Sequence, residues 1–236
     1  MYHSHSSLKE YEQCPYKYYR KRVVKDVKDD SGYPLVYGNV VHKAFELYVL
    51  DENLTWQEAM EQGCAKCSTR QFRIEANFGN LEPIARHLRD MPGEKHAELK
   101  LGLTFEGEPT KFFAKDGGYL RGIIDLVIVR GTTAFVVDYK TGKNRGDLDQ
   151  AERSAALVFA HYPEINKIFG RWLYVANGEQ ARFEFDRHDF EELMRATDRI
   201  ADDIAYSEEH KAWPKQPTGL CGWCPVKDCP NWIDRG

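Results

Sequence analysis

The first 95 residues are predicted to be mainly helical: apolar positions follow the helical period over 39–52, and residues 55–90 are polar and helix-favouring. Ser7 followed by Glu10 forms a capping box, which predicts a first helix that begins near Leu8. Pro15 is expected to interrupt or kink this helix just after Cys14. After a linker at 29–38, a second helix is predicted over 39–52 and further helices over 55–90, with breaks at 77–80 and at Pro83.

At residue 96 the pattern changes to short runs rich in β-branched and aromatic residues. Strands are predicted over 96–105, 117–129, 133–142, 168–176 and 180–186, with helices from Leu148 to His161 and over 187–207. The tail from Trp213 is loop-like. The order predicts one α/β domain over 1–236, with a helical lobe at 1–95, a mixed-sheet core at 96–212 and a cysteine-bearing tail at 213–236.

The middle strands meet at Gly131-Thr132, which fits a two-residue hairpin turn of type II′. If Arg130 pairs with Thr133, counting back in register brings Asp125 opposite Asp138. Like charges facing each other in an apolar sheet are destabilising, and a hard divalent cation such as Mg²⁺ or Mn²⁺ would offset that cost. Alternation places Lys140 on the face of Asp138. The other interpretation is a half-exposed edge hairpin in which Lys140 is an ordinary ion-pair partner.

Composition narrows the class of protein. The net charge of −4 argues against coating of nucleic acid by bulk electrostatics. No stretch approaches the roughly 18 apolar residues of a membrane span, so we expect a soluble cytoplasmic protein without a membrane partner. One local basic cluster is either a strand-binding track or a solvated helix face with buried tyrosines: Lys17, Tyr18, Arg20, Lys21 and Arg22.

The sequence G-I-I-D ending at Asp125, followed by D-Y-K-T-G-K from Asp138, resembles motifs of the PD-(D/E)XK nucleases. The similarity is to the RecB-type branch, which includes CRISPR-associated adaptation exonucleases and AddB-like nucleases. Its G-x-x-x-H-x-x-x-E helix is matched by Gly38, His42 and Glu46. The resemblance implies a restriction-endonuclease-like fold.

The resemblance also implies the roles of single residues. The metal ligands would be His42, Asp125, Asp138, the main-chain carbonyl of Tyr139 and, by position alone, Glu98, with catalysis by Asp125, Asp138, Lys140 and Gln150. Ser154 stands where the branch usually has a Tyr, which puts the DNA-positioning role of that helix in doubt.

Six cysteines in a reducing compartment indicate metal ligation more than disulfides. Some members of the branch hold an iron-sulfur cluster by one N-terminal and three C-terminal cysteines, which implies a [4Fe–4S] clasp at Cys14, Cys221, Cys224 and Cys229. Spacing alone does not separate this cluster from structural Zn²⁺. Cys64 and Cys67 have no βαβ context and no assigned chemistry.

Together these features predict a metal-dependent DNA nuclease, an exonuclease that acts on single-stranded DNA ends. The alternative is a non-catalytic DNA-binding or scaffolding module that keeps the fold. A third interpretation, a zinc-stapled RNA-binding or redox protein, rests on the cysteine count alone. A helicase, recombinase or integrase partner would be a separate protein, because the chain is too short for a motor of its own.

Overall fold

The centre of the protein is a six-stranded mixed sheet with the order β2-β1-β3-β4-β5-β6. The computed structural model describes residues 2–29, 32–114, 117–142 and 147–234. Neighbouring strands are antiparallel except for the parallel pair β4–β5. The strands are β1 (Glu94–Leu103), β2 (Pro109–Thr110), β3 (Leu120–Arg130), β4 (Thr133–Lys140), β5 (Lys167–Tyr174) and β6 (Glu179–Asp186).

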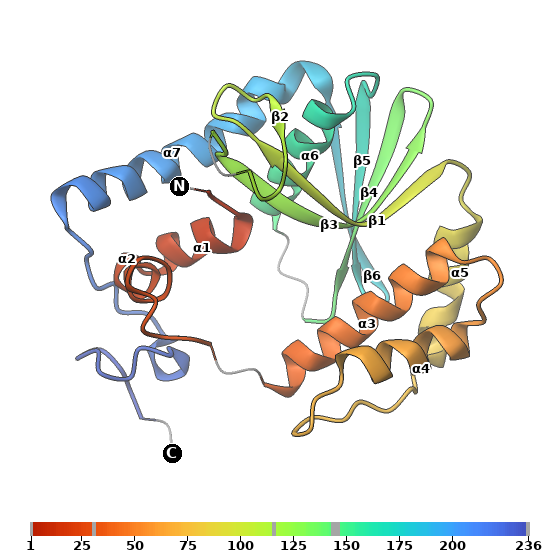
Figure 1. The fold of residues 1–236 in the computed structure, drawn as a ribbon, viewed down its shortest axis with the longest axis horizontal. Helices are drawn as coiled ribbons and strands as arrows, with labels where there is room; N and C mark the ends of the chain where they lie inside the picture. Colours follow the sequence, from red (N-terminus) through yellow and green to blue (C-terminus); the bar gives the residue numbers. More distant parts are fainter. Residues whose placement is uncertain (1, 30–31, 115–116, 143–146, 235–236) are drawn as a thin grey trace.

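Helices cover both faces of the sheet (Figure 1). The face of α3 (Tyr33–Leu50), α4 (Trp56–Cys67) and α5 (Glu82–Asp90) holds one buried core, and the face of α6 (Leu148–His161) and α7 (Phe190–His210) holds another. The parallel pair β4–β5 is joined through α6, as a parallel pair requires a crossover. The predicted α/β fold with a mixed sheet flanked by helices is confirmed.

The first helices of the chain and its C-terminal tail lie side by side next to the sheet and its helices (Figure 1). Here α1 (His5–Gln13), α2 (Pro15–Tyr18) and the π-helical turn η1 (Tyr19–Val24) contact the C-terminal tail. The Tyr16 amide donates to Pro214 O at 3.2 Å, and Tyr18 stacks on Trp213 with ring centroids 6.0 Å apart. The remaining short 3-10 segments are η2 (Gly79–Leu81), η3 (Arg187–Asp189) and η4 (Cys221–Trp223).

Several boundaries differ from the sequence predictions. The N-cap of α1 is Ser4, with Ser7 as its capping-box partner, so the helix begins three residues before Leu8. α3 begins at Tyr33, inside the expected linker, of which residues 30 and 31 lie outside the described residues. Pro34 and Pro83 each lie in the first turn of a helix, where a missing N–H costs nothing, so Pro83 starts a helix rather than breaking one. The short strand β2 was not predicted.

Candidate functional site

The hairpin register is as the sequence predicts. Arg130 pairs with Thr133, the ladder runs to Leu126↔Val137, and Gly131 has a φ of 58°. Asp125 and Asp138 follow at the end of this ladder, outside its paired positions, and their carboxylates contact different helices. Asp125 contacts α3, whereas Asp138 contacts α6. The hairpin therefore delivers one carboxylate to each layer of helices.

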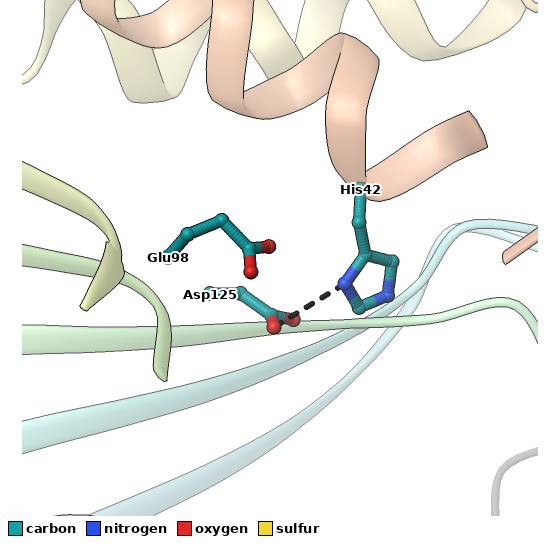
Figure 2. A group of neighbouring side chains, drawn as sticks. All are labelled: His42, Glu98 and Asp125. Carbon is teal, nitrogen blue, oxygen red and sulfur yellow. Dashed lines mark ion pairs between the residues drawn. The ribbon is translucent and has the colours of Figure 1, made fainter. Parts of the chain in front are cut away.

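The first group of side chains consists of His42 on α3, Glu98 on β1 and Asp125 on β3 (Figure 2). One ligand atom from each lies within 4.8 Å of the others. His42 Nδ1 is 3.2 Å from Asp125 Oδ1. Two carboxylates and an imidazole form a donor set that suits a divalent cation. Among the described residues this is the one group of three or more acidic, histidine or cysteine side chains close enough to share an ion.

A local distortion of the sheet brings Glu98 and Asp125 to the α3 face. The β1–β3 pairing is interrupted at these two positions, between Ala97↔Leu126 and Leu99↔Ile124. Ala97 and Leu126 belong to the core under α3, while Leu99 and Ile124 belong to the core under α6. The side chains of both strands thus change from one face of the sheet to the other at this point. Glu98 makes the change possible with a φ of 50°, a left-handed conformation that is strained for a residue with a Cβ.

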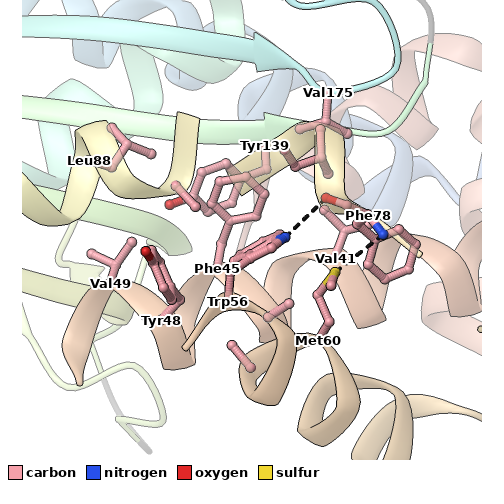
Figure 3. Close-up of a cluster of buried hydrophobic side chains, with 14 of the residues drawn as sticks. Val41, Phe45, Tyr48, Val49, Trp56, Met60, Phe78, Leu88, Tyr139 and Val175 are labelled. Carbon is pink, nitrogen blue, oxygen red and sulfur yellow. Dashed lines mark hydrogen bonds between the residues drawn. The ribbon is translucent and has the colours of Figure 1, made fainter. Parts of the chain in front are cut away.

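The main chain of Tyr139 joins the two halves of the site. Its N–H donates to Asp125 Oδ2 at 2.8 Å, and its carbonyl oxygen lies 2.8 Å from His42 Nε2. Its buried ring stacks on Phe45, one helical turn after His42, with centroids 4.2 Å apart (Figure 3). Apolar packing of α3 on β4 thus sets the distance between the histidine and the strand.

The second group is Asp138, Lys140 and Gln150, on the α6 side. Lys140 Nζ is 2.7 Å from Asp138 Oδ2 and donates to Gln150 Oε1 at 2.6 Å. The Gln150 amide nitrogen donates to Asp138 Oδ1 at 2.7 Å. The amide therefore orients both charged groups. The predicted placement of Asp138 and Lys140 on one face is confirmed, and Lys143 of the motif lies outside the described residues.

The electrostatics of the site favour a bound cation. Burial, followed by repulsion from Asp125, raises the pKa of both Glu98 and Asp138. Burial lowers the pKa of His42, but hydrogen bonding and attraction to Asp125, with help from Asp138 and the Tyr139 carbonyl, raise it to about 9. The protonated His42 ring thus donates from Nδ1 to Asp125 and from Nε2 to the Tyr139 carbonyl, which are two of the ligands that the sequence predicts.

The space above this group is a pocket of about 530 Å³, and it contains residues that the sequence did not single out. Asn39 and Lys43 lie on the His42 face of α3, and Lys100 lies two residues after Glu98 on β1. Helical spacing from His42 points to Asn39, and strand spacing from Glu98 points to Lys100, whereas Lys43 directly follows His42 and has no such signal. Cys67 also lines this pocket, which its sequence context did not indicate.

All four cysteines expected to hold a cluster line one cavity of about 170 Å³: Cys14, Cys221, Cys224 and Cys229. The cavity lies between the α1–α2 junction and the C-terminal tail. No three of these sulfurs lie within 4.8 Å of one another, so the described residues hold no preformed cysteine site for a single ion. The four half-buried thiols are brought together around a space instead.

The basic cluster differs from the expected strand-binding track. Tyr18 is only 1% exposed and packs in the core formed with α7, so the prediction that it binds DNA is wrong. Arg20 is ion-paired with Asp26 and Asp228, and Lys21 and Arg22 with Glu10. These contacts compensate much of the cluster's positive charge. Contact of Lys17, Arg20, Lys21 and Arg22 with DNA stays a prediction.

A mixed sheet with helices on both faces and acidic side chains at the hairpin is the architecture of restriction-endonuclease-like proteins. The sequence model of the PD-(D/E)XK nuclease superfamily matches residues 2–229. The chain belongs to this superfamily. Its members are nucleases that use divalent metals, which the group of His42, Glu98 and Asp125 is suited to bind.

A solved structure with a TM-score above 0.5 supports this fold. A protein described as a "putative exonuclease" from Eubacterium rectale is similar with a TM-score of 0.55 at 14% identity, over 97% of this chain and 86% of that one. The protein SSO0001 has a TM-score of 0.40 at 12% identity, over 98% of this chain and 87% of that one. Curated protein sequences yield no match. Within the described residues, no helix combines the length and apolarity needed to cross a bilayer.

Proposed function

We propose that this protein hydrolyses DNA phosphodiester bonds with Mg²⁺ or Mn²⁺ and acts as an exonuclease on single-stranded ends. The observation that carries the proposal is that one hairpin bears both Asp125, which groups with His42 of α3 and Glu98 of β1 as a candidate cation site, and the Asp138–Lys140 pair. The similarity of the fold to the Eubacterium rectale protein motivates the choice of exonuclease. We also propose that 1–236 forms a single nuclease domain.

His42, Glu98 and Asp125 would hold the cation. Asp138 and the carbonyl of Tyr139, which His42 Nε2 contacts in this structure, would be further ligands. A bound divalent cation polarises a phosphoryl oxygen and lowers the pKa of a coordinated water. The residues themselves supply orientation and charge. The Lys140 ammonium is placed to stabilise negative charge that develops on the phosphate. Gln150 acts as a positioning residue, because its amide holds Asp138 and Lys140 at their present separation.

The test is incubation of the purified protein with end-labelled single-stranded and duplex DNA, with and without Mn²⁺. We expect metal-dependent release of short products from single-stranded ends. Closed circular single strands should resist cleavage, because an exonuclease requires an end. DNA binding without cleavage under every metal condition would instead support the non-catalytic DNA-binding or scaffolding module.

We further propose that Cys14, Cys221, Cys224 and Cys229 bind a [4Fe–4S] cluster. Tetrahedral zinc with Zn–S bonds of about 2.3 Å brings its sulfurs to roughly 4 Å from one another. The proposal is supported by the four cysteines lining one cavity, although no three of their sulfurs lie that close together. A bound cluster would tie the first helices to the tail, and its role would be structural. A helicase, recombinase or integrase partner remains a prediction.

A further inference from the structure

Arg153 on α6 is a buried cation with unused hydrogen-bonding capacity. It is 2% exposed, donates from Nε to Thr197 Oγ1 at 3.3 Å, and contacts His5 Nδ1 through Nη1 at 2.9 Å. Its Nη2 atom has no hydrogen-bond partner among the described residues. Buried polar groups are nearly always paired, so an open guanidinium nitrogen calls for an explanation.

The charge of Arg153 is also uncompensated by direct contact. In the described parts of the chain, no carboxylate oxygen lies within 4.0 Å of its guanidinium. Burial lowers the pKa of Arg153, yet a guanidinium stays protonated in proteins. A buried charge without a partner is costly, and an anion is the ligand that would relieve the cost.

His5 stands between Arg153 and Asp147, which is one of four acids (Asp149, Glu12, Asp147 and Glu152) whose charges act on the guanidinium from beyond ion-pair distance. Because the guanidinium only donates, His5 Nδ1 must accept, which leaves the hydrogen on Nε2 facing Asp147 Oδ2 at 3.2 Å. Burial is the main cause that lowers the pKa of His5 to about 4, so the ring is neutral. Asp147 is further engaged by Lys9. The Asp147–His5 pair thus orients Arg153 without neutralising it.

Arg153 lines a pocket of about 360 Å³ between the start of α1, the first half of β3 and α6. Arg121 lines the same pocket and is likewise free of carboxylate contacts within the described residues; its guanidinium lies over the rings of Tyr2 and Phe112. Ser4 and Ser154 add hydroxyl groups. Two arginines and hydroxyl donors form the chemistry that binds phosphate.

The pocket adjoins the candidate active site. Ile123 lines both this pocket and the one above His42 and Asp125. Gln150 also lines the basic pocket, and its amide contacts Asp138 and Lys140. The two pockets therefore meet at Ile123, so that a strand held at the metal group would have its neighbouring phosphates near the arginine pocket.

We propose that this pocket is a second phosphate subsite, in which Arg153 and Arg121 bind a phosphate of the substrate strand next to the phosphate that is cleaved. The inference rests on the proposed function for the identity of the ligand. The phosphate is either an internal phosphodiester or the phosphate at a strand terminus. Ser154 lines the pocket with a small hydroxyl side chain.

The test is fluorescence anisotropy with a short labelled single-stranded oligonucleotide in EDTA, so that no cleavage is needed. We expect Arg153→Gln to weaken binding about tenfold and to reduce the slope of log K against log salt by about one. Arg121→Gln should weaken binding less, because it lies less buried. Arg182→Gln, on the exposed edge strand β6, is the matched control and should bind within about twofold of the wild type.

Two oligonucleotide series separate the sources of the phosphate. One lacks the terminal phosphate, and the other carries a neutral methylphosphonate at successive internal linkages. Each oligonucleotide is measured with the wild type and with Arg153→Gln. The phosphate bound by Arg153 is the one whose removal or neutralisation weakens binding to the wild type but leaves binding to Arg153→Gln unchanged. If neither series identifies such a phosphate, or if both arginine variants keep the wild-type affinity and salt slope, the subsite is refuted.

Thermal melting in EDTA distinguishes a ligand-binding role from a structural one. Removing an uncompensated buried charge should leave the melting temperature of Arg153→Gln unchanged or raised, whereas loss of a structural ion pair would lower it. Should Arg153→Gln fail to fold, Arg121→Gln decides the outcome through the same binding series. A wild type that binds through the arginines but never cleaves would refute the nuclease proposal alone.

Discussion

His42 Nε2 lies 2.8 Å from the carbonyl oxygen of Tyr139, and this contact links helix α3 to the strand that carries Asp138. With its pKa raised to about 9, the ring is doubly protonated near neutral pH and donates to both Tyr139 and Asp125. The imidazolium ring thus supplies positive charge to two oxygens that are expected to bind the cation. Metal binding and protonation of His42 therefore compete at the same atoms.

Protonation of His42 should also make the unfolding free energy of the metal-free protein depend on pH. The folded pKa of His42 lies above its ordinary value of 6.5, so its stabilising contribution is complete below pH 6.5 and is lost as the pH rises through about 9. The difference in unfolding free energy between wild type and His42→Gln should shrink by roughly 3 kcal/mol across that range. Urea unfolding in EDTA measures it. His87→Gln, an exposed histidine on α5, serves as control, and parallel pH curves for wild type and His42→Gln would contradict the assignment.

Asp138 and Lys140 should be needed for activity and not for folding. Asp138→Asn and Lys140→Ala are each expected to lower Mn²⁺-dependent DNA cleavage by at least about a hundredfold, because they remove a ligand and a charge-stabilising group. Since burial raises the pKa of Asp138, the neutral Asn should not lower the melting temperature in EDTA. Undiminished cleavage by either variant would rule out the proposed roles.

Because Glu98 has a left-handed conformation, replacing it by glycine should increase stability while weakening metal binding. Glu98→Gly relieves the strain at φ 50° and should raise the unfolding free energy in EDTA by about 1 kcal/mol relative to Glu98→Gln. Both variants should weaken Mn²⁺ binding, measured by calorimetry, because both lose the carboxylate. A glycine variant no more stable than the glutamine variant would show that the strain is absent in solution.

The cysteine clasp makes a spectroscopic prediction. Protein purified without oxygen should be brown, with broad visible absorbance and iron and sulfide in the ratio of a [4Fe–4S] cluster. Cys14→Ser should lose the colour and melt at a lower temperature, whereas Cys64→Ser, which lies on α4 away from the cavity, should keep both. Colourless protein with stoichiometric zinc would favour the structural-zinc alternative.

Local pattern was sufficient for much of this protein. The turn at Gly131 and the pairing of Arg130 with Thr133 follow from a two-residue loop between alternating strands, and helix α6 has the predicted bounds because its cap and its apolar period agree. Asp138 and Lys140 share a face because strand side chains alternate. These features depend on residues that are only a few positions apart in the chain, so they can be predicted from the sequence alone.

Tertiary structure decided the rest, because it depends on residues far apart in the chain. The switch of face at Glu98 comes from the pairing of β1 with β3, and no local signal announces a left-handed glutamate. Arg20 is neutralised by Asp228 from the other end of the chain. Arg153 looked like one more charge on a helix, and only packing against α1 and α7 buries it without a counterion. Sequence alone therefore determined which groups the hairpin carries, whereas burial and long-range contact decided which of them face a ligand.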